Sequence, residues 1–376
     1  MRILHTVEFY HPAVGGAERV VQRISEGLAA RGHQVLVATS EDPRRTGTHA
    51  AGVHIVPFRI SGNHARRLRG DVERYKAWLR SEGFDVILNY AAQSWPTDAM
   101  LPLLGEIAGV KILATCGFSG LHGLRRPLYW SYFRMLAEQI REYDGLIFHG
   151  QTGVDASFGR RHGRGDSVVI ANGADGREFD AAEPGFRARH GIQSRFMLLH
   201  VGNHHNVKGH RDLIRLLDTL HDLDVTLVLI GEGASGGRSC WDACARAARR
   251  DDRLRLLHSL PRSDVVAAFR EGDLFLLPSR FEAAPLVLVE AMAGGLPFVS
   301  YDVGNAGELA GGVVVRGFRQ MTAAVRTLLN DGSRREVLGR AGREMQRRAL
   351  EWEHLIDRYE AFYAQLMKGK AFGHRA

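Results

Sequence analysis

Apolar residues along the chain follow two alternating patterns. Short apolar runs with strand character lie at residues 2–9, 33–40, 53–60, 84–90, 110–117 and 144–150. Helical periodicity fills the intervals between them, most clearly over residues 16–32, where an amphipathic pattern ends in Gly32. Strands that are separated by helices predict a parallel sheet covered on both faces.

A second series of the same kind begins at residue 196. Its apolar runs lie at residues 196–203, 225–233, 254–260, 274–279, 296–302 and 311–315. Between the two series, residues 176–193 lose the apolar periodicity, which indicates a connection between domains. The last segment, from residue 335 onward, is strongly helical. Because ligands of such sheets bind at the carboxyl ends of strands, we expect the site in a cleft between two α/β halves.

Length and composition set broad limits. A chain of 376 residues is long for one core and sufficient for two domains. Its 45% hydrophobic and 24% charged residues are ordinary for a soluble globular protein. No apolar run approaches the ~20 residues of a membrane span, and the first one is too short for a signal peptide. We therefore expect a cytoplasmic protein.

The three cysteines, Cys116, Cys240 and Cys244, are too few and odd in number for a disulfide framework. Cys240 and Cys244 lie one helical turn apart, and the sequence shows no matching pair that would complete a zinc site. Asp222 and Asp224 form a D-x-D pattern before a strand and are expected at the surface. We therefore expect no bound metal.

The net charge of +8 favours anionic partners, such as nucleic acid, a nucleotide donor or an acidic membrane face. No zinc pattern, evenly spaced basic helix or aromatic-rich binding sheet supports nucleic acid, so we expect none as a partner. Basic and aromatic residues mix at 125–136, and residues 61–70 add Arg66, Arg67 and Arg69. These segments fit either an anionic membrane surface or solvated helices with a buried aromatic face.

Residues 274–302 carry the most specific pattern, a strand, a loop, a helix, a Gly-Gly stop and a second strand. Pro285 fits the first helical position, because its missing N–H group would be unpaired there. Gly294 and Gly295 fit the end of the helix. The N–H groups of Leu286 and Val287 would then face outward at a positive helix end, which is suited to an anion.

Two carboxylates flank this helix start. Glu282 lies in the loop before it, and Glu290 lies roughly 7–8 Å beyond Pro285 along the helix. Carboxylates accept hydrogen bonds from sugar hydroxyls, so the arrangement suits a diphosphate with a sugar on either side, which is a nucleotide sugar. A solvated loop glutamate and an ordinary helix glutamate remain the alternative.

The run PSRFEAAPLVLVEAMAGGLPFV resembles the E-x7-E motif of GT-B retaining glycosyltransferases of family 4, also called glycosyl transferases group 1. The resemblance implies that Glu282 binds hydroxyls of the donor sugar and that Glu290 binds the ribose. It further implies two Rossmann-like domains, with acceptor binding at 1–175, a linker at 176–193 and nucleotide-sugar binding at 194–355. The helix 356–376 would return to the N-terminal domain, and no cofactor is implied.

Two further motifs of the second half resemble the same family. In HVGNHHNVKGH, Lys208 matches the lysine that meets the donor phosphates, and Asn203 stands at the arginine position. His204, His205 and Arg280 are alternatives for the second cationic contact. In VLIGEGA, Gly231 belongs to the turn near the nucleoside, although such a turn is weak support by itself.

The N-terminal half carries a matching glycine pair and one departure. In FYHPAVGGAERVV, Gly15 and Gly16 let backbone approach the donor phosphate or the acceptor, although a plain strand-to-helix turn is the alternative. Cys116 occupies the place where the family ends a strand in histidine. His122 is the nearby histidine that could reach the cleft, or it is an ordinary loop residue.

The sequence therefore predicts a glycosyltransferase that moves a hexose-type sugar from a UDP- or GDP-sugar to a hydroxyl of a glycan or lipid-linked acceptor. The family makes cell-surface polysaccharide or lipopolysaccharide synthesis the expected route. The alternative is an inactive sugar-nucleotide-binding subunit, which Asn203 and Cys116 favour. A Rossmann dehydrogenase is disfavoured, because no G-x-G-x-x-G follows the first strand. The predicted catalytic residues are Glu282, Lys208 and His122; the predicted donor-binding residues are Gly15, Gly16, Asn203, Lys208, Gly231, Arg280, Glu282, Leu286, Val287 and Glu290.

Overall fold

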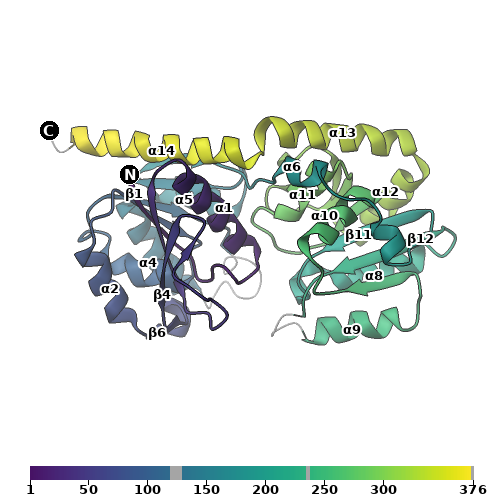
Figure 1. Ribbon diagram of the computed structural model, residues 1–376, viewed down its shortest axis with the longest axis horizontal. Helices are drawn as coiled ribbons and strands as arrows, with labels where there is room; N and C mark the ends of the chain where they lie inside the picture. The colour runs from purple at the N-terminus through teal and green to yellow at the C-terminus, as the bar shows by residue number, and fades with distance from the viewer. Residues whose placement is uncertain (119–128, 234–237, 374–376) are drawn as a thin grey trace. The chain divides into compact units, whose positions relative to one another are not determined.

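The computed structural model of the protein describes residues 1–118, 129–233 and 238–373. The chain divides into two compact units (Figure 1). The first unit contains residues 1–172 and 352–376, and the second contains residues 173–351. Each unit is built around its own, mainly parallel sheet, which confirms the predicted α/β class.

The described part of the first unit holds an eight-stranded sheet with the order β10-β9-β8-β7-β1-β2-β4-β3, in which only β3 pairs antiparallel. Its strands are β1 (Arg2–Thr6), β2 (Gln34–Ser40), β3 (His49–Ala50), β4 (Val53–Phe58), β7 (Val86–Tyr90), β8 (Val110–Ala114), β9 (Gly145–Phe148) and β10 (Asp166–Val169). A small hairpin joins β5 (Ile60–Ser61) to β6 (Arg69–Gly70). The chain reverses its direction of travel across the sheet between β1 and β7, which is where ligands of such folds bind.

The main helices of the first unit are α1 (Gly16–Ala30), α2 (Val72–Ser81), α3 (Trp95–Met100), α4 (Trp130–Gln139), α5 (Val154–His162) and α14 (Trp352–Gly373). Helix α14 runs along the first unit beside α1 (Figure 1). Buried Tyr359 and Tyr363 anchor it, and the Tyr363 hydroxyl lies 3.1 Å from Nε2 of His5 on β1.

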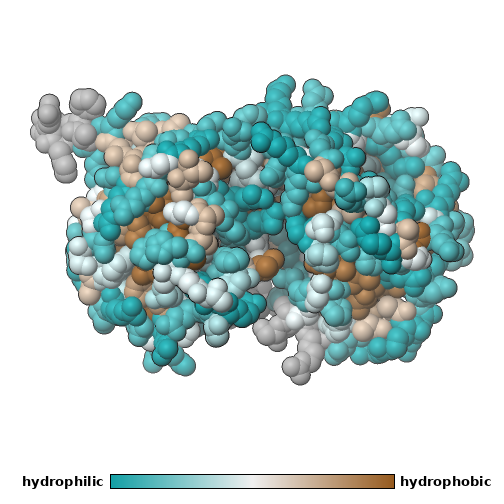
Figure 2. Space-filling model, viewed as in Figure 1, coloured by the Kyte–Doolittle hydropathy of each residue, from teal (hydrophilic) through white to brown (hydrophobic). Residues whose placement is uncertain are grey.

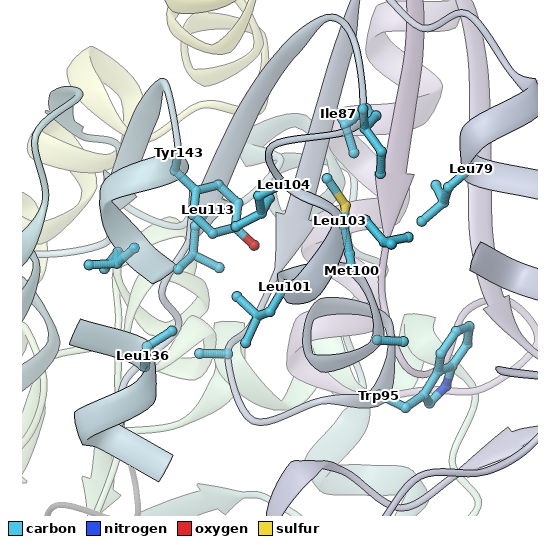
Figure 3. Close-up of a cluster of buried hydrophobic side chains, with 14 of the residues drawn as sticks. Leu79, Ile87, Trp95, Met100, Leu101, Leu103, Leu104, Leu113, Leu136 and Tyr143 are labelled. Atoms are coloured by element: carbon cyan, nitrogen blue, oxygen red, sulfur yellow. The ribbon is translucent and has the colours of Figure 1, made fainter. Parts of the chain in front are cut away.

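Apolar side chains of the strands and helices fill the core of the first unit. One cluster is shown in Figure 3 and includes Leu79, Ile87, Trp95, Met100, Leu113, Leu136 and Tyr143. The Trp95 indole N–H donates a 2.8 Å hydrogen bond to Ser40 Oγ, so the polar edge of this large ring is satisfied. Each fully buried large apolar side chain contributes about 1.5–3 kcal/mol.

The described part of the second unit holds a six-stranded parallel sheet with the order β13-β12-β11-β14-β15-β16. Its strands are β11 (Phe196–Val201), β12 (Val225–Ile230), β13 (Leu254–Leu257), β14 (Leu274–Leu277), β15 (Phe298–Tyr301) and β16 (Gly312–Val315). Its main helices are α8 (His210–Thr219), α9 (Arg238–Ala248), α10 (Arg262–Glu271), α11 (Leu286–Gly294), α12 (Phe318–Asn330) and α13 (Gly332–Ala349). The direction of travel reverses between β11 and β14, so the loops after these two strands meet at the ligand edge of the sheet.

The predicted linker at 176–193 is part of the second unit. It forms two short helices, α6 (Gly176–Asp180) and α7 (Phe186–Arg189), which pack on α10. Phe179 and Phe186 are fully buried and anchor them. Two apolar anchors among polar residues leave no periodicity for a sequence pattern to detect, and the observed boundaries fall after Asn172 and after Glu351.

The surface carries few large exposed apolar side chains among the described residues. The view in Figure 2 is mainly hydrophilic on both units. Val14 is 90% exposed and Trp130 is 64% exposed, both in the first unit. None of the helices in the described ranges has the length and apolar character needed to cross a lipid bilayer.

Candidate active site

Helix α11 presents its N-terminus after the loop that follows β14. Pro285 is the N-cap residue and Leu286 is the first helical residue, so the helix begins one position later than the sequence predicts. The first turn closes when the Leu288 N–H donates to the Pro285 carbonyl. The N–H groups of Leu286 and Val287 come before the first regular helical hydrogen bonds, as at every helix start. They can therefore serve an anion there.

The end of α11 matches the prediction. Gly294 is the last helical residue, and Gly295 adopts a left-handed conformation with φ of 70°. Only glycine enters this region without strain, so the Gly-Gly pair sets the length of the helix. A short helix between two buried strands fixes where its N-terminus lies.

Lys208 and Glu282 form an ion pair in the second unit. The Lys208 Nζ atom lies 2.8 Å from Glu282 Oε1, and the two side chains are 29% and 12% exposed. Lys208 ends the turn η6 (Asn206–Lys208) after β11, and Glu282 follows β14. The Arg280 N–H donates a 2.7 Å hydrogen bond to the Val207 carbonyl, which ties the two loops together. An ammonium group and a carboxylate therefore stand together where the α11 segment begins.

Gly209 allows the Lys208 turn to approach the loop after β14. Its φ is 76°, and a Cβ atom there would lie 2.2 Å from the Pro278 carbonyl oxygen. Gly231 serves a similar purpose after β12, because a Cβ atom there would lie 2.1 Å from the Gly202 carbonyl oxygen. Both glycines thus have a packing role that does not require a ligand.

Glu290 lies on the second turn of α11 and is 7% exposed. Its Oε1 atom lies 2.7 Å from Nη1 of Arg262, the first residue of α10. Arg262 also donates to both carboxylate oxygens of Glu178, at 2.8 and 2.9 Å. Its guanidinium lies 5.6 Å from the centre of the Phe179 ring. Arg262 therefore binds two carboxylates, that of Glu290 from the predicted pair and that of Glu178.

Burial opposes the charge on Arg262, but its contacts outweigh this effect. The hydrogen bond with Glu178 and the charges of Glu290 and Glu178 hold the pKa of the Arg262 guanidinium above its ordinary value. Glu178 is not among the predicted site residues, because it lies in the segment expected to be a linker. No local pattern relates it to Arg262, which is 84 positions away.

Asn203 and Arg280 take up other contacts in the second unit. The Asn203 side-chain oxygen accepts a 3.3 Å hydrogen bond from the Glu232 N–H, which links the loops after β11 and β12. The Arg280 guanidinium lies 3.8 Å from Asp212, and its side chain is 70% exposed. Arg280 therefore keeps most of its donors toward solvent beside the Lys208–Glu282 pair.

In the first unit, Gly15 precedes α1 and Gly16 is the first residue of this helix. Gly15 caps the helix, and a Cβ atom there would lie 2.2 Å from an oxygen of Glu18. Glycine thus leaves room for the Glu18 carboxylate to fold back over the helix N-terminus. Burial raises the pKa of the Glu18 carboxyl, and it raises that of Glu8, where the charge of Glu18 adds to the effect.

Cys116 follows β8 with a φ of 56°. Burial raises the pKa of its thiol to about 12, so the thiol is protonated at neutral pH and is a poor nucleophile. Asp155 fixes the same strand end, because its carboxylate accepts from the Thr115 hydroxyl and from the Gly117 N–H. His122 lies outside the described residues, as do Arg125 and Arg126.

The D-x-D residues are exposed, as predicted. Asp222 pairs with Arg326 at 2.7 Å, and Asp224 accepts a 2.8 Å hydrogen bond from the Arg195 N–H. Both carboxylates thus act at the surface, away from the ligand edge of the sheet.

Comparisons with known proteins agree with this architecture. Residues 14–177 match Glycosyltransferase Family 4, and residues 183–345 match Glycosyl transferases group 1. The sucrose-phosphate synthase of Thermosynechococcus elongatus shares the fold with a TM-score of 0.83 and 19% identity, over 98% of this chain and 99% of that one. The fold and the matched families define a glycosyltransferase of GT-B type.

Two more relatives cover nearly the whole length. The glycogen synthase of Mycobacterium tuberculosis (strain H37Rv) is 26% identical over 412 residues, which is 98% of this chain and 96% of the relative. Anabaena HepE in complex with UDP-glucose has a TM-score of 0.78 and 18% identity, over 97% of this chain and 100% of that one. The chain belongs to the family 4, or group 1, glycosyltransferases.

Proposed function

We propose that the protein transfers a hexose-type sugar, with retention of anomeric configuration, from a nucleotide diphosphate sugar to an acceptor hydroxyl. The observation that carries the proposal is the Lys208–Glu282 pair at 2.8 Å, which lies in the loops beside the α11 segment that also bears Glu290. A cation and a helix N-terminus suit the diphosphate of such a donor, and two carboxylates suit its two sugars.

Each group has a distinct part in the proposed mechanism. The N–H groups of Leu286 and Val287 and the Lys208 ammonium bind the diphosphate and stabilise the charge that grows on it. Glu282 accepts from hydroxyls of the transferred sugar, and Glu290 accepts from the ribose. Gly15 and Gly16 bring the first unit's backbone to the donor phosphate or the acceptor.

The proposed chemical step takes place on one face of the sugar. The bond from the anomeric carbon to the diphosphate oxygen breaks as the acceptor oxygen bonds to the same carbon. The acceptor's proton passes to the departing diphosphate oxygen, so no carboxylate nucleophile is needed. Lys208 and Arg280 provide positive charge at the leaving group, and we propose that the step needs no divalent metal.

The donor screen is the direct test of this function. Thermal unfolding would be followed with UDP-, GDP- and ADP-sugars, beginning with UDP-glucose because the similar HepE structure holds it. One class should raise the melting temperature, and Glu290→Gln should reduce the rise, whereas exposed Glu336→Gln should not. No rise with any class at millimolar donor would overturn the proposal.

The acceptor and location are a second part of the proposal. We propose a glycan or lipid-linked acceptor of cell-surface polysaccharide or lipopolysaccharide synthesis, reached from the cytoplasmic side of the membrane. The net charge of +8, exposed Trp130 and the Arg134 guanidinium 5.5 Å from its ring centre support contact with anionic lipid. Sedimentation with anionic vesicles, but not neutral ones, tests this contact.

An inactive sugar-nucleotide-binding subunit is the alternative function. Asn203 at the family's arginine position and Cys116 at its histidine position favour it. The two functions differ in turnover, because an active transferase releases nucleoside diphosphate from its donor. Release by the purified protein alone, abolished in Lys208→Met, would exclude the inactive subunit.

A further inference from the structure

Three ligand-type side chains meet in the second unit beneath the loop that carries Lys208. His204 lies in that loop, His210 begins α8, and Cys240 lies on α9. One nitrogen or sulfur atom from each lies within 4.8 Å of those from the other two. Their exposed fractions are 0%, 1% and 3%. None of the three has a role in the donor site proposed above.

The distances are close to those of a transition-metal site. Cys240 Sγ lies 3.8 Å from Nδ1 of His204, whereas a sulfur and a nitrogen on one tetrahedral zinc ion are about 3.6 Å apart. The His204 and His210 rings are stacked with their centres 4.2 Å apart. Small rotations of these side chains would bring the three atoms onto one ion.

The two histidines of this triad also carry buried ring nitrogens without hydrogen-bond partners. Nε2 of His204 and at least one ring nitrogen of His210 are buried and make no hydrogen bond. Buried polar groups are nearly always satisfied, so such a concentration calls for a missing ligand. A pair of core histidines alone would be expected to find protein partners.

We propose that His204, His210 and Cys240 bind one zinc ion, or another divalent transition metal that prefers nitrogen and sulfur ligands. The two imidazoles donate neutral lone pairs, and the Cys240 thiol releases its proton to solvent as the metal–sulfur bond forms. Nitrogen and sulfur ligands select such metals over magnesium or calcium.

His200 is a neighbouring histidine, although it lies outside the group of three whose ligand atoms meet within 4.8 Å. Its ring centre lies 4.8 Å from that of His210, and its Nε2 is buried without a partner. Its Nδ1 lies 2.8 Å from the Leu276 carbonyl oxygen. Metal-binding histidines commonly donate their second nitrogen to a carbonyl in this way, which orients the ring.

The metal would fix the position of the loop after β11. It would join that loop to α8 and α9 at positions on either side of Lys208, without touching the donor. The sequence alone did not predict this triad, because its two histidines lie 30 or more positions from Cys240. The proposal departs from the metal-free expectation only for this structural role.

Cobalt titration tests the site directly. Full-length protein would be stripped with a chelator and titrated with Co²⁺, which gives a sulfur-to-metal charge-transfer band when a thiolate binds. We expect one equivalent per chain and loss of this band in Cys240→Ser. Cys244→Ser is the matched control, because Cys244 is also buried, one turn further along α9, and lies outside the triad.

The same measurement contains the outcomes that overturn the proposal. No bound metal at stoichiometric Co²⁺ or Zn²⁺ would do so, as would a band that persists in Cys240→Ser. If that variant does not fold, alkylation of the wild-type protein decides, because Zn²⁺ should slow modification of Cys240 at least tenfold. Equal rates with and without Zn²⁺ would refute binding. Neither experiment uses a sugar nucleotide, so failure here is distinct from failure of the transferase proposal.

Discussion

The ammonium of Lys208 lies 2.8 Å from a carboxylate oxygen of Glu282, although 74 positions separate the two residues. Their strands, β11 and β14, are neighbours in the sheet at the point where the chain reverses its direction of travel. The sheet topology therefore brings together two residues that come from two separate sequence motifs. This pair is the most direct subject for mutation.

Lys208→Met should lower kcat about 10²–10³-fold, because it removes one charged donor at the leaving group. Stability should change by less than about 1 kcal/mol, since the lost ion pair is partly exposed. Steady-state kinetics measures the first effect and urea unfolding the second. Lys76→Met is the control, because Lys76 makes a comparable pair with Glu73 on α2. Equal rates for the two variants would contradict the role of Lys208.

Arg262 and Glu290 should be energetically coupled. Their side chains are 31% and 10% exposed, so solvent screens the 2.7 Å pair only in part. A double-mutant cycle with Arg262→Met and Glu290→Gln should give a coupling of about 1–3 kcal/mol in urea unfolding. The surface pair Arg80–Glu106, with side chains 45% and 53% exposed, should give less than about 1 kcal/mol. A coupling no larger than that of the surface pair would show that the Arg262 contacts do not stabilise the second unit.

His5 should make the first unit sensitive to acid. Burial lowers the pKa of this histidine from 6.5 to about 3, and its ring nitrogens contact Ser25 and Tyr363. As pH falls below about 6.5, the unfolded chain takes up the proton before the folded one does. The free energy of unfolding should therefore fall by up to about 1.4 kcal/mol per pH unit on this account.

His5→Gln should remove that contribution to the pH dependence. Urea unfolding between pH 6.5 and pH 4 would show a slope smaller by up to one proton than that of wild type. An unchanged slope in His5→Gln would show that the buried imidazole does not control acid stability.

Gly27 sets the approach of α1 to α14. A Cβ atom at this position would lie 2.2 Å from Cδ1 of Ile356, which is 7% exposed. Gly27→Val should destabilise the first unit by about 1–3 kcal/mol through overpacking, and Ile356→Ala in the same chain should recover part of the loss. Thermal unfolding measures both. Gly83→Val has open space around its Cβ and should be nearly neutral.

Local sequence patterns predicted the elements well because strands and helices depend on short-range periodicity. The β14–loop–α11–β15 segment is an example, with its start wrong by one residue at Pro285. Long-range polar partners could not be predicted in the same way. Glu178 reaches Arg262 only because the two anchors Phe179 and Phe186 fold the supposed linker onto the second unit. His122 stays a prediction, since it lies outside the described residues.

Helix α14 belongs to the first unit but is synthesised after the second unit. A ribosome therefore completes residues 173–351 before the first unit receives Leu355, Tyr359 and Tyr363, which are fully buried there. The second unit can fold while the first unit still exposes the apolar surface that these residues cover. A premature stop near residue 351 would consequently damage the N-terminal unit and leave the sequence of the second unit whole.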